Sequence, residues 1–251
     1  MPGLHTVISK DNSELSKKIK NHYSELLHEE NFKIKKLVYE KNIISGLSLH
    51  SGYPFQEYKE PGYHVLILGA IYNINCDKIK SKLDEIKNCF VLGKDYLKKI
   101  SQFVNEADGE FIIQLIIGEP KKIIIFNDYL GRLPLYYYSE SDCTIISSEI
   151  KTILAFIHDI TYNYFGLVQF LIFEHTLDKH TIFENVFLIK PSQVLLINVQ
   201  TRQRIVVYKS SDLNFKLHNP FENKKQSIVS LLNSFNKSFC SNAFMPFPKF
   251  K

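Results

Sequence analysis

The stretch from Asn105 to Leu154 constrains the fold more than any other part of this chain. It contains short apolar runs, rich in Ile, Phe and Tyr, that residues typical of turns separate from one another. The first three runs are Phe111–Ile117, Lys122–Phe126 and Leu135–Tyr138. Runs of this length bounded by Gly, Pro and Asp are typical of buried antiparallel strands. A fourth run, Thr144–Ile146, leads into Ser147–Lys151, where a serine before an apolar-periodic segment predicts a helix N-cap. We therefore predict a β-meander that serves as scaffold.

Hydrophobic periodicity predicts further elements on both sides of this meander. Alternation of apolar residues indicates strands, and spacing of three or four residues indicates helices. The predicted strands are Leu4–Ile8, Lys36–Glu40, Ile43–Leu49, Thr181–Val186, Gln193–Asn198 and Arg204–Tyr208. The predicted helices are Ser13–Glu29, Asp77–Lys87, Lys94–Val104 and Tyr162–Phe173. Leu167, Phe170 and Leu171 share one face of the last helix, and we expect that face to lie in the core.

Composition excludes several classes of protein. A chain of 251 residues that is 45% hydrophobic can bury the core of one large domain. The net charge of +5 comes from basic residues spread along the chain, so we expect no nucleic-acid binding. The chain lacks both an apolar run long enough to cross a bilayer and a signal peptide, so we expect no membrane partner. Four separated cysteines without a C-x-x-C pair indicate reduced thiols, no metal site and a cytoplasmic protein.

Two motifs in the central stretch carry a family resemblance. Residues 128–137 read DYLGRLPLYY, and residues 148–151 read SEIK. This order resembles the core of the N-terminal glutaminase domain of asparagine synthetase and its relatives, the class II glutamine amidotransferases. The similarity extends to Leu68–Asn73 and to Thr181–Val186 with Pro191, and it covers roughly residues 1–210. It implies an α+β fold, an αββα four-layer sandwich of the N-terminal-nucleophile hydrolase type, with two antiparallel sheets flanked by helices.

The same resemblance implies a catalytic cysteine that this chain lacks. In active family members, removal of the initiator Met exposes a cysteine whose thiol attacks glutamine while its own α-amine acts as the base. The second residue here is Pro2, which has no nucleophilic side chain. We therefore expect no catalytic residue at this position, and Met1–Gly3 is interpreted as the lead into the first strand.

The glutamine anchors of the family are also replaced. The segment Ser45–His50 resembles the family strand whose arginine binds the α-carboxylate of glutamine in a bidentate salt bridge, and Gly46 occupies the arginine position, followed by Leu47. His50 ends this segment and either contacts a different ligand or is an exposed surface residue. Asp95 is the nearest counterpart of the family aspartate that contacts the α-amine, although a residue at this position also suits a helix start.

The triplet Leu68-Gly69-Ala70 departs from the family in two of its three positions. The family has an asparagine at position 68, which donates a hydrogen bond to the oxyanion, a contact worth about 3 kcal/mol in the transition state. Leucine cannot donate. The family glutamate that pairs with the α-ammonium group is Ala70 here. Gly69 matches the family and also suits a close-packed strand. These positions together describe a degenerate glutamine pocket.

Residues 1–209 are thus predicted to form a glutamine amidotransferase-like domain. Residues 210–251 are predicted to hold a linker and, over Asn219–Phe239, the first helix of a truncated synthetase-like domain. The family's glycine-rich ATP loop is missing, so ATP and Mg²⁺ are implied only for an absent synthetase domain, and we expect no cofactor in this chain. The resemblance implies a homodimer or a separately encoded synthetase domain as partner.

Two hypotheses for function follow. The first is a catalytically silent glutaminase-like domain that belongs to, or pairs with, an ATP-dependent amide-forming domain. The second is a stand-alone ligand-binding or protein-interaction module, which the apolar end of the chain, Phe239–Phe250, also suits. An active glutaminase is disfavoured by the missing nucleophile.

Overall fold

The structure is a computed structural model that describes residues 2–9, 32–40, 42–140, 143–157, 159–191, 193–201, 204–208 and 233. The predicted helix over Ser13–Glu29 and the predicted linker and helix of residues 210–251 lie outside the described residues, apart from residue 233. The boundary at residue 209 therefore stays a prediction.

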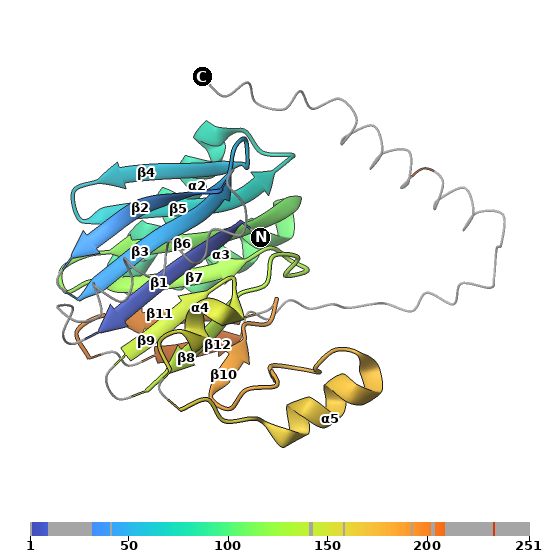
Figure 1. The fold of residues 1–251 in the computed structure, drawn as a ribbon. Coiled ribbons are helices and arrows are strands. Elements are labelled where there is room, and N and C mark those ends of the chain that lie inside the picture. The colour runs from blue at the N-terminus through green and yellow to red at the C-terminus, as the bar shows by residue number, and fades with distance from the viewer. Residues whose placement is uncertain are drawn as a thin grey trace.

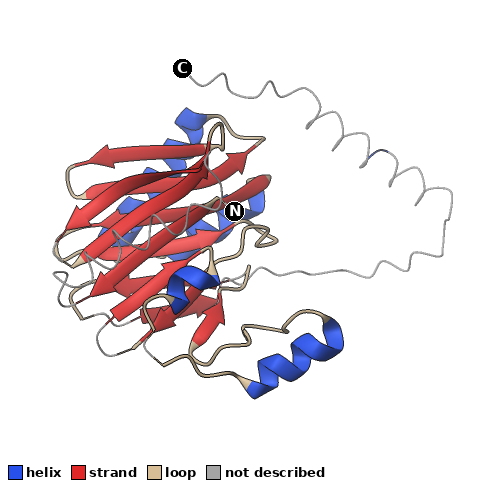
Figure 2. Ribbon diagram, in the orientation of Figure 1, coloured by secondary structure: helices blue, strands red, loops and turns tan. Residues whose placement is uncertain are grey.

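Within the described residues, two antiparallel sheets of six strands each form the centre of the molecule (Figures 1 and 2). The order in the first sheet, sheet A, is β10 (Val186–Leu188), β8 (Tyr136–Ser139), β9 (Cys143–Ser147), β1 (Gly3–Ser9), β3 (Ile43–His50) and β2 (Phe32–Glu40). The order in the second, sheet B, is β12 (Arg204–Tyr208), β11 (Gln193–Asn198), β7 (Lys122–Asn127), β6 (Gly109–Ile117), β5 (Tyr63–Ile71) and β4 (Phe55–Glu60). The predicted meander thus spans both sheets.

Helices cover the outer faces of the sheets. Helices α2 (Cys76–Val91) and α3 (Tyr96–Glu106) lie on sheet B, where Ile79, Leu83 and Phe103 pack against strand residues such as Phe111. Helix α4 (Ile150–Leu154) lies on sheet A, with Ile153 in a smaller cluster that includes residues of β1, β3, β8 and β9. The result is the predicted αββα four-layer sandwich. Helix α5 (Tyr164–Phe173) projects from the sandwich below β10 in Figure 1.

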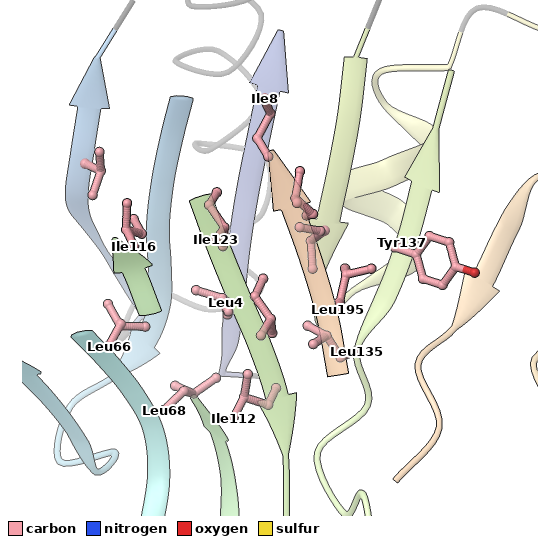
Figure 3. Packing of buried hydrophobic residues seen from close by; sticks show 14 of the residues in the cluster. Leu4, Ile8, Leu66, Leu68, Ile112, Ile116, Ile123, Leu135, Tyr137 and Leu195 are labelled. Carbon is pink, nitrogen blue, oxygen red and sulfur yellow. The ribbon is translucent and has the colours of Figure 1, made fainter. Parts of the chain in front are cut away.

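The main core lies between the two sheets, where alternate residues of each strand face the opposite sheet. Figure 3 shows part of it: Leu4 and Ile8 come from sheet A, and Leu66, Leu68, Ile112, Ile116, Ile123 and Leu195 come from sheet B. In Figure 3, Leu68 and Ile112 lie toward the lower end of this core and Ile8 lies at the upper end, with Leu4 and Ile116 between them. Burial of a side chain of this kind contributes about 2 kcal/mol, so this layer contributes a large share of the stability of the domain.

Two local predictions were wrong because a hydroxyl group bonds elsewhere. Strand β10 begins only at Val186, because the Thr181 hydroxyl donates to Val186 O at 2.8 Å and accepts from Phe183 N at 3.1 Å, which bends the predicted strand Thr181–Val186. Helix α4 has Glu149 at its N-cap without a side-chain cap, because the Ser148 hydroxyl accepts a hydrogen bond from Leu4 N at 3.1 Å.

The expectation that the apolar face of α5 lies in the core was also wrong. Phe170 and Leu171 are 47% and 73% exposed. The buried residues of this helix are Gly166 and Gln169, so its small and polar side contacts the rest of the domain.

Candidate functional site

Most of the predicted site residues lie at one end of the sandwich, which we call the mouth. Strand β1 begins there at Gly3, which pairs with Ser48 near the end of β3. Strand β5 ends there, where Ile71 pairs with Gly109 at the start of β6. The mouth is the end of the core at which Leu68 and Ile112 lie, toward the bottom of Figure 3. Strand register also pairs His5 of β1 with Ser147 of β9, residues that are 142 positions apart in the sequence.

The start of β1 is held by the serine of the SEIK motif. Ser148 Oγ accepts a hydrogen bond from Leu4 N at 3.1 Å, and Ser148 N donates to Leu4 O at 2.9 Å. Pro2 comes directly before this strand and is half-buried. Pro2, at the position predicted for the family nucleophile, therefore lies two residues before Leu4, which Ser148 holds in place.

The two leucines of the predicted pocket are core residues. Leu68 and Leu47 are both 0% exposed and belong to the cluster between the sheets, from β5 and β3 respectively. Leu68 lies near Leu4 and Ile112 in Figure 3. The position predicted to hold the oxyanion donor is thus filled by hydrocarbon, and it offers no hydrogen bond to a developing charge.

Gly69 is required by the backbone. Its φ is 95°, and a Cβ added there would lie 2.1 Å from Glu110 O. Its N–H donates to Pro54 O at 3.0 Å. Because L-residues rarely adopt this conformation and no space exists for a side chain, glycine is needed for the path of the chain.

Gly46 lies on the other face of sheet A, opposite His5 in the register of β3 and β1. His5 is buried, and its ring nitrogens lie 2.9 Å from Ser147 Oγ and 2.9 Å from Ser48 Oγ. These contacts satisfy the imidazole within the protein. The position predicted to hold the family arginine is therefore next to a polar cluster that also includes Thr152 of α4, whose Oγ1 lies 3.3 Å from His5 Nδ1.

The mouth also holds charged and phenolic groups that the sequence analysis missed. Glu110 is the direct cross-strand partner of Ala70, so a carboxylate lies one strand away from the missing family glutamate. Burial, and next the charge of Glu110, raise the pKa of Tyr53 to about 12, and the same two causes raise the pKa of Tyr72. Arg132 donates from Nη1 to Gly109 O at 2.7 Å.

The sequence places both residues beside predicted elements, but it does not show that they meet at the mouth. Glu110 directly precedes the apolar run Phe111–Ile117, so it lies at the start of β6. Arg132 lies inside the DYLGRLPLYY motif, whose Asp128 shapes the turn by accepting hydrogen bonds from Leu130 N and Arg132 N at 3.0 Å each.

His50 and Asp95 have other local roles. His50 is exposed at the end of β3; its Nδ1 lies 2.9 Å from Ser51 O, and its ring packs edge-on against Tyr53 with 5.4 Å between centroids. Asp95 is the N-cap of α3 and accepts a hydrogen bond from Lys98 N at 3.1 Å. Since α3 has 11 residues and ends near Gly109, Asp95 lies about 16 Å along the helix from the mouth.

The described residues contain no group of three or more His, Cys, Asp or Glu side chains that could hold a metal ion. No helix within the described ranges is both long and apolar enough to cross a membrane.

Comparisons with known proteins find several similar chains. A Gibberella zeae protein named "Amidase chry2" is 25% identical over 166 residues, which cover 64% of this chain and 24% of that protein. Among solved structures, a glutamine phosphoribosylpyrophosphate amidotransferase from B. subtilis in complex with ADP and GMP aligns with a TM-score of 0.43 at 12% identity. A structure described as the allosteric regulatory enzyme of purine biosynthesis aligns with a TM-score of 0.46 at 12% identity. Each of these two alignments covers 84% of this chain and 50% of the other.

The chain therefore spans at most half the length of these matched proteins. The family model described as a glutamine amidotransferase domain matches residues 35–209, which is more than half of the chain. That range contains most of β2 and all of β3 through β12, and so all of sheet B and all of sheet A except β1 and the start of β2. The chain belongs to the class II glutamine amidotransferase domain family.

Proposed function

We propose that this chain is a catalytically silent glutaminase-like domain, similar to the glutaminase half of glutamine-hydrolysing asparagine synthetase. In that reaction, ammonia released from glutamine amidates an ATP-activated aspartate. The observation that carries the proposal is the arrangement at the mouth. Pro2 occupies the nucleophile position, and Leu68 fills the position of the oxyanion donor with buried hydrocarbon.

Two requirements of glutamine hydrolysis are unmet at these positions. The thioester route needs a thiol and an α-amine on one residue, and proline supplies no thiol. The developing oxyanion needs a donor worth about 3 kcal/mol, and Leu68 packs with Leu4 and Ile112 instead. The chain therefore lacks the reactive thiol, and it also lacks room for the oxyanion donor, since a polar atom at position 68 would be surrounded by side chains of both sheets.

The charged anchors of glutamine are missing in the same way. Gly46 and Ala70 carry no charge, so neither the carboxylate nor the ammonium group of glutamine has the partner that the family provides. Glu110, beside Ala70, and Arg132 supply charges at the mouth from other strands and loops. These groups support a mouth that binds something other than glutamine in the family's pose.

We infer that the domain works with an ATP-dependent amide-forming domain, either following in the same protein or separately encoded. ATP and Mg²⁺ would bind to that domain, and this chain needs no cofactor. A homodimer and a cytoplasmic location also belong to this proposal. The proportion of the matched proteins that this chain covers supports it, because the aligned domain is a part of longer proteins in each case.

A second candidate function is a stand-alone ligand-binding module. A pocket of about 550 Å³ favours this second candidate, and the pocket lies at the end of the sandwich opposite to the mouth. Its lining includes Val38 from β2, His64 from β5 and Lys121 before β7. A thermal-shift screen against metabolites separates the candidates, because saturable stabilisation by a ligand other than glutamine favours the binding module.

Glutamate release from glutamine tests the proposed silence. We expect none from the wild-type chain and none from Pro2→Cys alone, because restoring the thiol leaves position 68 apolar. Pro61→Cys, at an exposed turn, is the matched control for an added thiol. Glutamate release by Pro2→Cys above that of Pro61→Cys would show that the rest of the pocket still works, and it would overturn the proposal.

A further inference from the structure

Helix α5 exposes a continuous apolar surface. Tyr164, Phe165, Leu171 and Ile172 are between 61% and 79% exposed. Val168, Phe170 and Phe173, on the same helix, and Leu177, in the loop after it, are 40% to 52% exposed. We call this set the α5 patch. Contiguous apolar patches of this kind on soluble proteins mark sites of interaction.

The orientation of α5 is the reverse of an ordinary surface helix, which buries its apolar face. Gly166 packs directly on the main chain, so that a Cβ added there would lie 2.1 Å from Thr181 O. Gln169 Oε1 accepts a hydrogen bond from Leu177 N at 3.0 Å, and Asn163 Oδ1 caps the helix by accepting from Gly166 N at 3.1 Å. Polar bonds and close backbone contact thus fix the helix with its apolar side outward.

We propose that the α5 patch is the docking site for the C-terminal segment of this same chain, residues 219–250. This segment carries Phe221, Ile228, Leu231, Leu232 and Phe235 at helical spacing, followed by further phenylalanines. Between residues 226 and 248 its sequence contains a single charged residue, Lys237, and α5 contains none. Two uncharged apolar surfaces of this kind gain about 25 cal/mol for each Å² of apolar area removed from water.

The chain leaves the sandwich within reach of α5. Tyr208, the last residue of β12, pairs with Gln193, the first residue of β11. Val186 precedes Gln193 by seven residues and accepts a hydrogen bond from Thr181, which in turn packs on Gly166 of α5. With at most about 3.6 Å for each residue of extended chain, α5 begins within about 45 Å of Tyr208.

The connecting residues are long enough to cover this distance. Residues 209–221, when extended, span about 45 Å. A segment tethered in this way has an effective concentration in the millimolar range. A second copy of the chain would have to bind from dilute solution, so the tether favours the chain's own segment as the occupant. The inference does not depend on whether the mouth is active.

Cross-linking within the full chain tests the proposal. Cys240 lies in the C-terminal segment and serves as one attachment point. Leu171→Cys supplies the other, in a background where Cys76, Cys89 and Cys143 are replaced by serine. Leu92→Cys is the matched control, because Leu92 is 65% exposed at the end of α2, on the outer face of sheet B. After treatment with a short bis-maleimide, we expect an intramolecular product joining residues 171 and 240, and none joining residues 92 and 240.

Two results would overturn the proposal. Cross-linked dimers through position 171 would assign the α5 patch to a second copy of the chain. Rapid modification of position 171 by a monofunctional maleimide, at the rate of position 92 and without an intramolecular product, would show that the α5 patch is uncovered.

A second measurement keeps the test independent of the introduced cysteines. In the full chain, Leu231→Glu with Leu232→Glu should speed hydrogen exchange of the α5 amides several-fold, while amides of β6 exchange unchanged. Ser238→Glu, in the same segment but outside the apolar set, is the control. Unchanged exchange of α5 in the double variant would also contradict the proposal.

Discussion

Three polar side chains close a hydrogen-bonded ring between the two sheets, and their removal gives a sharp prediction. Thr6 Oγ1 donates to Gln114 Oε1 at 2.7 Å, and Gln114 Nε2 donates to Ser45 Oγ at 3.0 Å. Because the threonine proton is used for the glutamine, Ser45 donates to Thr6 Oγ1 across the remaining 2.9 Å. All three residues are at most 1% exposed. The ring therefore joins sheet A to sheet B inside an apolar layer.

The magnitude follows from which groups lose a partner. In Gln114→Leu, the hydroxyl groups of Thr6 and Ser45 lose their hydrogen bonds to the glutamine side chain. The hydrogen bond between the two hydroxyls uses the proton of only one of them, so the other proton has no acceptor. A buried donor without an acceptor costs about 1–3 kcal/mol, so we expect the free energy of unfolding to fall by about 2 kcal/mol. The triple variant Thr6→Val, Ser45→Ala, Gln114→Leu leaves no such donor, and replacing all partners by apolar groups of similar shape is nearly neutral.

Urea unfolding followed by circular dichroism measures these differences. Gln200→Leu, at an exposed position, is the control for the substitution itself and should change the free energy of unfolding by less than about 0.5 kcal/mol. The expected order is that the triple variant is more stable than Gln114→Leu. A triple variant less stable than the single one would refute the reasoning, because it would mean that the ring contributes net stability beyond satisfying its own members.

Three further predictions concern positions around the mouth and the helices. Gly69→Ala should lower the free energy of unfolding by about 3 kcal/mol, because the backbone there has a positive φ and the added Cβ would clash with main-chain atoms. Gly93→Ala, where φ is also positive but the space is open, should lower it by about 1 kcal/mol. Equal losses in urea unfolding would contradict this prediction. Asp95→Ala should cost about 1 kcal/mol by removing the cap of α3, and an unchanged urea midpoint would show that the cap contributes nothing. The pKa of Tyr53 is about 12 in the folded chain against the ordinary 10.0, so the folded state keeps the phenol proton at a pH where the unfolded chain loses it. The free energy of unfolding should therefore fall as pH rises from about 10 through 12, and it should fall less steeply in Tyr53→Phe. An unchanged slope in that variant would refute this prediction.

Much of the fold was predictable because its signals are local. Apolar runs bounded by Gly, Pro and Asp gave β6, β7 and β9 to within two residues of their observed limits. Helices α2 and α3 were also predicted from spacing, and they end later than predicted. In each case one face of the element packs in the core, so the spacing of the apolar residues in the sequence matches the spacing of the buried positions.

The prediction for α5 failed for a physical reason. Periodicity identifies a helix but does not say which of its faces is buried, and the rule that apolar faces are buried was reversed there by Gly166 and Gln169. The strand predicted at Thr181–Val186 failed because a side-chain hydroxyl competes with the strand for main-chain groups.

The sequence could predict only which family residues are replaced at the candidate site. Positions 2, 46, 68 and 70 could be compared with the family motif, residue by residue. Glu110 and Arg132 could not be found in that way, because strand pairing and turn geometry, which the sequence does not display, bring them to the mouth. Burial of Leu68 between the sheets was likewise visible only in the structure.

The most direct test of catalytic silence is the intact mass of the wild-type chain after exposure to an electrophilic glutamine analogue that carries a diazoketone. An active member of the family would be alkylated on its terminal thiol, with protection by glutamine. Because we propose that Pro2 and Leu68 stand at the positions of the family nucleophile and oxyanion donor, we predict no glutamine-protected adduct. A stoichiometric adduct at the mouth that glutamine prevents would reveal a working nucleophile and pocket, and it would contradict the account.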